Sequence, residues 1–261
     1  MPTYVGYEER STAPLRRLQV PHPNVTVIIN LGAPLKVHAP ALHAPGAVYG
    51  SFAAGLFDTV ALTESTGNSA GIELNLTPLG MWQLVGVPLC ELMNRVVSLD
   101  ALFGPTARAV EEQLRNTASW DLRFDVLEAL LADRLRQSRV PSAAVQWAWT
   151  QIVTAPQSTL VAEIARELQW SRRRLTAVFR ERVGITPKAA ARVVRFDRAV
   201  PAVRRGQSVN WSALAWQCGY ADQAHLVREF REFSGLSPTA FLRQQTATGL
   251  AAGERADTLT S

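Results

Sequence analysis

Residues 171–187 read SRRRLTAVFRERVGITP, and residues 222–238 read DQAHLVREFREFSGLSP. At an offset of 51 residues the two stretches share Leu, Phe, Arg, Glu, Gly and Pro at matching positions. Chance identity at so many positions is improbable. The pattern therefore indicates an internal repeat, in which each copy is one supersecondary unit.

Both copies carry the same three helix signals. Each has a residue suited to an N-cap, a glycine suited to a left-handed helix end, and a proline suited to the first turn of the next helix. In the two copies these are Ser171 and Asp222, Gly184 and Gly235, and Pro187 and Pro238. Each copy thus predicts a helix of about twelve residues.

A shorter helix is predicted before each capped helix, at Val161–Leu168 and at Trp211–Cys218. A short helix, a tight turn and a capped helix form a helix-turn-helix motif. Gly219 supplies the usual small residue in the second turn, and Gln169 occupies the matching place in the first. A helix from Lys188 to about Arg204 is expected to join the two motifs.

The stretch AWQCGYADQAHLVREFREFSGLSP at residues 215–238 resembles the second helix-turn-helix signature of the AraC-type family of bacterial transcription regulators. The resemblance extends from near Ser142 to near Leu242. Gln169 departs from the family pattern, which usually has Gly there, and predicts a strained or differently shaped first turn. Pro201 also departs from it, because a proline inside the linker helix removes one backbone hydrogen bond and is expected to kink or shorten that helix.

The resemblance implies an α+β protein of two domains. Residues 1–140 are expected to form a β-rich barrel or sandwich with trailing helices, which senses a ligand or dimerises. Residues 141–246 are expected to form an all-α domain with two helix-turn-helix motifs and a linker helix, and 247–261 a flexible tail.

The N-terminal half has its own strand and helix signals. Apolar and alternating patterns predict strands at Val25–Leu31, Gly46–Phe57, Thr59–Thr63 and Gly71–Leu76. Helical patterns follow at Pro78–Val85, Pro88–Val97, Pro105–Ala118, Asp121–Arg136 and 143–154. A small barrel or sandwich has a lined interior, in which Tyr49, Phe52 and Phe57 are candidate ligand contacts.

Charge is unevenly distributed along the chain. Residues 1–140 carry 11 Lys and Arg against 13 Asp and Glu, whereas residues 166–205 carry 12 basic residues against 3 acidic ones. A basic second half indicates that this half contacts a polyanion. The alternative is a solvated helical surface in an arginine-rich chain, since Lys occurs only at Lys36 and Lys188.

Most of the predicted DNA contacts are outward positions early in the two capped helices, because the first turns reach base edges in the major groove. They are Arg172, Arg173, Arg174 and Thr176 in the first motif, and Gln223, Ala224, His225 and Arg228 in the second. Arg180, further along the first helix, is also a predicted DNA contact and is expected to touch a phosphate or an acidic neighbour. The resemblance places base readers at Arg172, Arg173, Thr176, Gln223, Ala224 and Arg228. Phosphate anchoring is the alternative for the arginines. Arg192, Arg195 and Arg205 are expected to touch phosphates or acidic neighbours.

The sequence offers little for catalysis. His22, His38 and His43 lack the close His-x-His pair that metal-binding barrels usually use, so no metal and no cofactor are predicted. Cys90 is expected to pack in the core, as is Cys218. The alternative function is an enzyme domain that processes a small molecule, fused to a secondary DNA-binding module.

The expected partners are double-stranded promoter DNA, a small effector, RNA polymerase and a second copy of the chain. No apolar run approaches the ~20 residues of a membrane span, and the N-terminus lacks the order of a signal peptide. A cytoplasmic location is therefore predicted.

Overall fold

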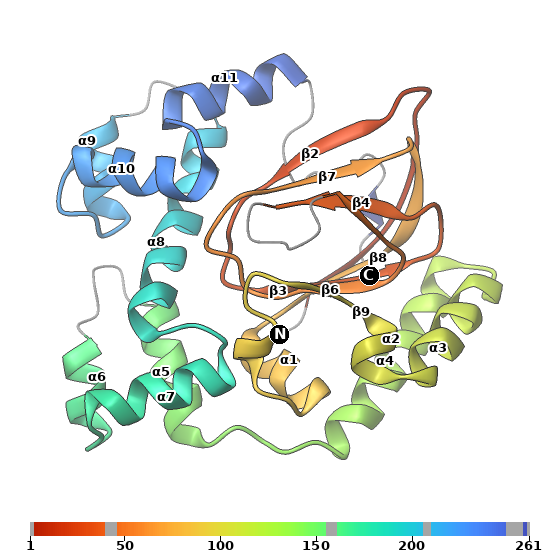
Figure 1. The fold of residues 1–261 in the computed structure, drawn as a ribbon, viewed down its shortest axis with the longest axis horizontal. Helices are drawn as coiled ribbons and strands as arrows, with labels where there is room; N and C mark the ends of the chain where they lie inside the picture. Colours follow the sequence, from red (N-terminus) through yellow and green to blue (C-terminus); the bar gives the residue numbers. More distant parts are fainter. Residues whose placement is uncertain (1–2, 40–45, 155–160, 206–209, 249–257, 260–261) are drawn as a thin grey trace.

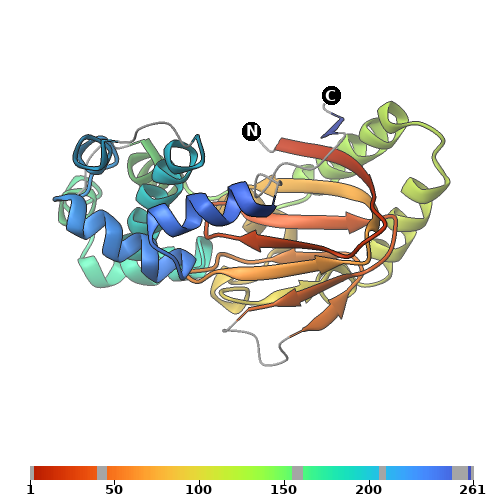
Figure 2. The ribbon, with the colours of Figure 1, turned by 90° about the horizontal axis from the view of Figure 1, so that it is seen from above.

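The N-terminal half of the protein contains two facing antiparallel sheets, and the C-terminal half is helical (Figures 1 and 2). The structure, a computed structural model, describes residues 3–39, 46–154, 161–205, 210–248 and 258–259. This arrangement confirms the predicted α+β class, with the two sheets in place of a closed barrel.

The larger sheet has six strands, in the spatial order β10 (Thr258–Leu259), β1 (Thr3–Arg10), β8 (Asn68–Leu76), β3 (Val25–Asn30), β6 (Phe52–Ala54) and β9 (Val96–Ser98). The smaller sheet has four, in the order β2 (Leu15–Gln19), β7 (Ala61–Ser65), β4 (Leu35–His38) and β5 (Ala47–Tyr49).

Strand β3 explains why one segment reads as a continuous apolar run. Val25, Val27 and Ile29 belong to the core beneath the helices, whereas Ile28 packs with Phe52 in a cluster between the two sheets. Successive side chains of a strand point to opposite faces, and both faces of this strand are covered.

The helices of the N-terminal half are α1 (Pro78–Val85), the short 3-10 helix η1 (Leu89–Glu91), α2 (Leu99–Phe103), α3 (Pro105–Asn116) and α4 (Trp120–Arg136). The bounds of α1 match the prediction, because its signals are local. The Thr77 hydroxyl accepts a hydrogen bond from the Gly80 N–H at 3.1 Å, and Gly86 ends the helix at φ 72°.

Several predictions for this half differ from the structure. The helix expected at Pro88–Val97 is wrong: only η1 forms there, and strand β9 follows and pairs with β6. The strand expected at Gly46–Phe57 is two strands, β5 and β6, in different sheets. Cys90 is exposed, so its predicted core packing is also wrong, whereas Cys218 is buried as expected.

The C-terminal half contains α5 (Ala143–Thr154), α6 (Val161–Glu167), α7 (Arg172–Arg182), α8 (Pro187–Arg204), α9 (Trp211–Gln217), α10 (Gln223–Ser234) and α11 (Pro238–Thr248). Helix α8 is the predicted linker, and one motif lies at each of its ends (Figure 1). Pro201 does not shorten α8, because it lies in the last turn and the helix continues to Arg204. The Arg205 N–H still donates to the Pro201 carbonyl at 3.1 Å.

The hydrophobic core does not divide at the predicted boundary near residue 140. One cluster runs from the larger sheet through α1 and α5 to the first motif, and includes Leu175 and Phe179. A second cluster is formed by the far part of α8 with α9, α10 and α11, and Leu18 and Val20 beside β2 pack against it. The first motif therefore shares a core with the sheets, and the second has its own.

The predicted flexible tail is partly described. Helix α11 extends to Thr248, and Thr258 and Leu259 pair with Tyr7 and Gly6 of β1. Residues 249–257 and 260–261 lie outside the described residues.

Candidate nucleic-acid interface

The capped helices α7 and α10 begin with the same geometry. The Ser171 hydroxyl accepts a hydrogen bond from the Arg174 N–H at 3.1 Å, and an Asp222 carboxylate oxygen accepts one from the His225 N–H at 2.7 Å. Both residues have the extended backbone of an N-cap. The two predicted N-caps are present in the structure.

The turns before these helices also repeat. The Trp170 N–H donates to the Ala165 carbonyl at 2.8 Å, and the Tyr220 N–H donates to the Ala215 carbonyl at the same distance. Gln169 has φ 53° where Gly219 has φ 81°. The turn of the first motif therefore has the same left-handed backbone as the turn of the second. Gln169 in place of Gly strains the backbone there and does not change the shape of the turn.

The inward faces of both helices are set by apolar residues four positions apart. Leu175 and Phe179 are fully buried in α7, and Leu226 and Phe230 are fully buried in α10. Residues at i and i+4 share one helix face, so burying these pairs turns the opposite face outward.

In the first motif the predicted DNA contacts lie on this outward face. Arg172, Arg173, Arg174 and Arg180 are exposed, and Thr176 is half-buried. The Arg174 guanidinium carbon lies 4.5 Å from the centre of the Trp170 ring, a cation–π contact that holds this arginine beside the turn. The first turn of α7 therefore presents a cluster of guanidinium groups to solvent.

In the second motif Gln223, Ala224 and Arg228 are exposed, whereas His225 is half-buried and turned toward the protein. The His225 Nδ1 atom accepts from the Ala221 N–H at 3.3 Å, and the ring meets Tyr220 edge to face. Burial raises the pKa of the Tyr220 hydroxyl. His225 thus differs from the other predicted contacts, because its polar atoms already have internal partners.

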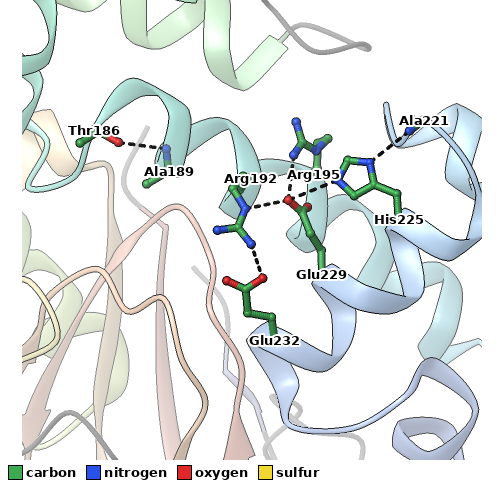
Figure 3. Close-up of polar contacts among 8 residues, drawn as sticks. All are labelled: Thr186, Ala189, Arg192, Arg195, Ala221, His225, Glu229 and Glu232. Atoms are coloured by element: carbon green, nitrogen blue, oxygen red, sulfur yellow. Dashed lines mark hydrogen bonds and ion pairs between the residues drawn. The ribbon is translucent and has the colours of Figure 1, made fainter.

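Glu229 joins the recognition helix α10 to the linker helix α8 (Figure 3). Its Oε1 atom lies 2.7 Å from Arg192 Nε and 3.0 Å from Arg195 Nη2, and His225 Nε2 is 3.6 Å away. Arg192 also reaches Glu232 at 2.5 Å. Arg192 and Arg195 therefore bind acidic neighbours, one of the two roles expected for them.

Sequence reasoning missed Glu229. The signal was in the repeat itself, because the matching position in the first copy is the apolar Val178. A charged residue that replaces an apolar one within a repeat indicates a partner specific to that copy. Glu229 has only 7% of its side chain exposed and contacts two arginines of α8, so it fixes the angle at which α10 leaves the linker.

The first motif is fixed differently, by the N-terminal half. The Arg182 guanidinium carbon lies 3.9 Å from the centre of the Trp82 ring of α1. A Cβ atom added at Gly184, which has φ 96°, would lie 3.0 Å from the Leu89 carbonyl oxygen of η1. Helix α7 therefore packs tightly against the segment between β8 and β9.

A family model described as "Helix-turn-helix domain" matches residues 164–244. The match covers 81 of the 261 residues and contains both motifs described above. The chain therefore carries a helix-turn-helix domain of the kind found in DNA-binding transcription regulators.

Solved structures show the same architecture. ToxT from Vibrio cholerae is 10% identical, with a TM-score of 0.51 over 92% of this chain and 98% of that chain. A ToxT structure bound to (E)-4-(8-methylnaphthalen-1-yl)but-3-enoic acid is 12% identical, with the same TM-score and coverage. At these identities the likeness shows the fold alone, which is a β-rich half followed by helices.

A probable AraC family transcriptional regulator from Rhodopseudomonas palustris is 24% identical over 40% of this chain and 97% of its own length, with a TM-score of 0.35. No curated protein matches the sequence.

A cavity lies between the two sheets of the N-terminal half, with a volume of about 120 Å³. Of the three aromatic candidates, Phe52 and Phe57 are among its lining residues and Tyr49 is not. Within the described residues, no group of three or more His, Cys, Asp or Glu could hold a metal ion, and His43 lies outside them. In the same part of the chain, no helix has the length and apolarity that crossing a membrane requires.

Proposed function

We propose that one chain places α7 and α10 in successive major grooves of a duplex, ~34 Å apart, and so reads an operator sequence. The supporting observation is the doubled motif. Two helices with the same caps and turns, each with an exposed polar or basic first turn, lie at the ends of one linker helix. Base readout is assigned to Arg172, Arg173, Thr176, Gln223, Ala224 and Arg228, and phosphate contact to Arg174 and Arg180.

His225 has a different part in this proposal. Because its ring already contacts Ala221, Tyr220 and Glu229, it orients the first turn of α10 instead of reading a base. Gln223 and Arg228 remain the residues whose side chains suit adenine and guanine in the major groove.

The test is a DNA mobility shift on the region upstream of the protein's own gene. Arg173→Ala and Arg228→Ala should each weaken specific binding by roughly tenfold, the lower end of what one base contact contributes, and weaken non-specific binding less. Arg10→Ala, at an arginine of β1 whose side chain is 82% exposed, is the control and should change neither. Equal losses on specific and non-specific DNA would make both arginines phosphate contacts. Absence of any specific shift at every salt concentration would contradict operator reading.

The N-terminal half is proposed to sense a small effector in the cavity between its sheets. ToxT, whose fold is similar, has been solved with a small organic acid bound. Contact with RNA polymerase, pairing with a second copy, and the division into a sensor at 1–140 and a DNA-binding domain at 141–246 belong to the same proposal.

A further inference from the structure

The cavity between the sheets has a chemistry that narrows the choice of ligand. Its lining includes buried apolar residues, among them Ile28, Leu35 and Phe52. It also includes a buried ion pair between Glu9 and Arg17. We propose that this cavity takes a small uncharged molecule, about the size of one substituted ring, with an acceptor oxygen that pairs with Arg17. This rests on the proposed sensor role of the N-terminal half.

The size of the cavity limits the ligand. Its volume is about 120 Å³. A dry apolar cavity of about 150 Å³ in another protein holds a benzene molecule. This cavity is somewhat smaller, so it encloses one ring at most and a short substituent has to extend toward its opening. A long chain or a fused ring system does not fit.

Glu9 and Arg17, two charged residues in the lining of the cavity, form an ion pair with each other without a ligand. Arg17 Nη1 donates to Glu9 Oε2 at 3.0 Å, and Arg17 Nη2 donates to Glu9 Oε1. Ser69 also donates to Glu9, at 3.1 Å. An anionic ligand would compete with Glu9 for Arg17, and a cationic one would compete with Arg17 for Glu9. Either would leave a charge unpaired in a buried site, which is unfavourable.

The other ionisable side chains in the described lining are His22 and Glu73. The His22 Nδ1 atom accepts a hydrogen bond from the Asn24 N–H at 3.3 Å, as a neutral ring does. Glu73 accepts from the Asn75 side chain at 3.2 Å, and the charges of Glu73 and Arg204 act on the pKa of His22 in opposite directions. An uncharged ligand is therefore the class that the site accommodates.

Two polar atoms in the lining call for an acceptor or donor on that ligand. The Arg17 Nε–H and the Thr59 hydroxyl are buried and have no hydrogen-bond partner among the described residues. The Arg17 side chain is only 8% exposed, so water satisfies its Nε–H poorly. A carbonyl or ether oxygen on the ligand would accept from Arg17 Nε–H, whereas a hydrocarbon would leave it unsatisfied.

Four ring compounds of similar size test the proposal on the full chain by titration calorimetry. They are acetophenone, which is neutral with an acceptor oxygen, ethylbenzene, which is neutral without one, benzoate, which is an anion, and benzylamine, which is a cation. Acetophenone should bind at least tenfold more tightly than the other three. Binding of benzoate or benzylamine as tight as that of acetophenone, or no binding of any probe, would overturn the proposal.

Arg17→Lys isolates the acceptor contact, because it keeps a positive charge opposite Glu9 and removes Nε. It should weaken acetophenone binding at least tenfold and leave ethylbenzene unchanged. Arg16→Lys is the matched control on the outer face of the same strand, where Arg16 pairs with Glu64 and is 69% exposed. It should alter neither affinity.

If Arg17→Lys does not fold, a second measurement on the unmodified chain tests the same contact. The Arg17 Nε–H resonance in a nitrogen–proton spectrum should move on addition of acetophenone and not of ethylbenzene, and no movement with acetophenone would contradict the contact. The ligand experiment and the DNA-binding experiment can fail independently, because the DNA mobility shift is measured without any of the ring compounds. Specific DNA binding without probe binding would remove the ligand class and keep the DNA-binding function.

Discussion

The two helix-turn-helix motifs have the same internal geometry and different surroundings. Leu175 and Phe179 of the first motif lie in one cluster with the sheets and α1. Leu226 and Phe230 of the second lie in a separate cluster, to which the N-terminal half adds Leu18 and Val20. Repeated residues therefore determine the shape of each motif, whereas residues unique to each copy determine what it is attached to. The first motif shares a core with the N-terminal half, and the second is held mainly by α8.

The substitution expected to have the largest effect on the stability of one motif alone is Glu229→Gln. It removes the charge that pairs with Arg192 and Arg195, and loss of one partner from a buried ion pair destabilises by about 3 kcal/mol. Hydrogen–deuterium exchange should show loss of protection at 211–242 and little change at 161–185. Glu232→Gln, at a 59% exposed partner of Arg192, is the control, with an expected effect under about 1 kcal/mol. Equal loss in both motifs would contradict separate attachment.

A matched pair of glycines gives the next largest effect. Gly184→Ala and Gly235→Ala both place a side chain at positive φ, which costs about 1 kcal/mol. At Gly184 the added Cβ also lies 3.0 Å from the Leu89 carbonyl oxygen, whereas at Gly235 the nearest atom is 4.0 Å away. Gly184→Ala should therefore lower the free energy of unfolding by about 2 kcal/mol in total. The comparison fails if urea denaturation gives equal losses for the two variants.

Substitutions at the two turn residues, Gln169 and Gly219, should change the free energy of unfolding by a smaller amount and in opposite directions. Gln169→Gly should stabilise the chain by about 1 kcal/mol, because Gln169 adopts φ 53°, a region where glycine has no steric penalty. Gly219→Ala, at φ 81°, should destabilise it by a similar amount. Both are measured by urea denaturation of the full chain, and destabilisation by Gln169→Gly would show that the glutamine side chain makes a needed contact.

The smallest predicted effect concerns pH at the junction with the second motif. Burial lowers the pKa of His22, and the charge of Arg204 lowers it further against the opposing effect of Glu73. The unfolded chain takes up this proton near pH 6.5 and the folded chain resists it, so stability is complete above about pH 6.5 and falls as the pH drops below it. Urea denaturation at pH 7.5 and 5.5 should show this loss, and His22→Gln should reduce it. An unchanged pH dependence in the variant would assign the loss to other groups.

Local signals made the C-terminal half largely predictable. Caps, left-handed glycines and helix-starting prolines act within one or two turns, so the repeat located α7, α8 and α10 to within a residue or two. The shortening expected from Pro201 was wrong, because a proline in the last turn of α8 removes one hydrogen bond without ending the helix.

Long-range pairing limited the prediction of the N-terminal half. The strand β2 reads LRRLQ, which has no apolar alternation, and Arg17 is buried there because Glu9 arrives from β1. Residues Val96–Ser98 form a strand because β6 offers an edge, and the two β-branched valines suit it, although a helix was predicted as far as Val97. For the DNA interface, the outward positions were foreseeable from the 3.6-residue period. The inward turn of His225 was not, because it depends on Glu229 and Tyr220.

The strand β2 and the residue after it have a consequence for promoters. Arg17 and Val20 line the cavity, while Leu18 and Val20 support the core of the second motif. A molecule that reshapes this strand would change how α10 meets its half of an operator and leave α7 in place. Promoter variants in the half read by α7 would then alter basal occupancy, and variants in the half read by α10 would alter inducibility, so that evolution could tune the two separately.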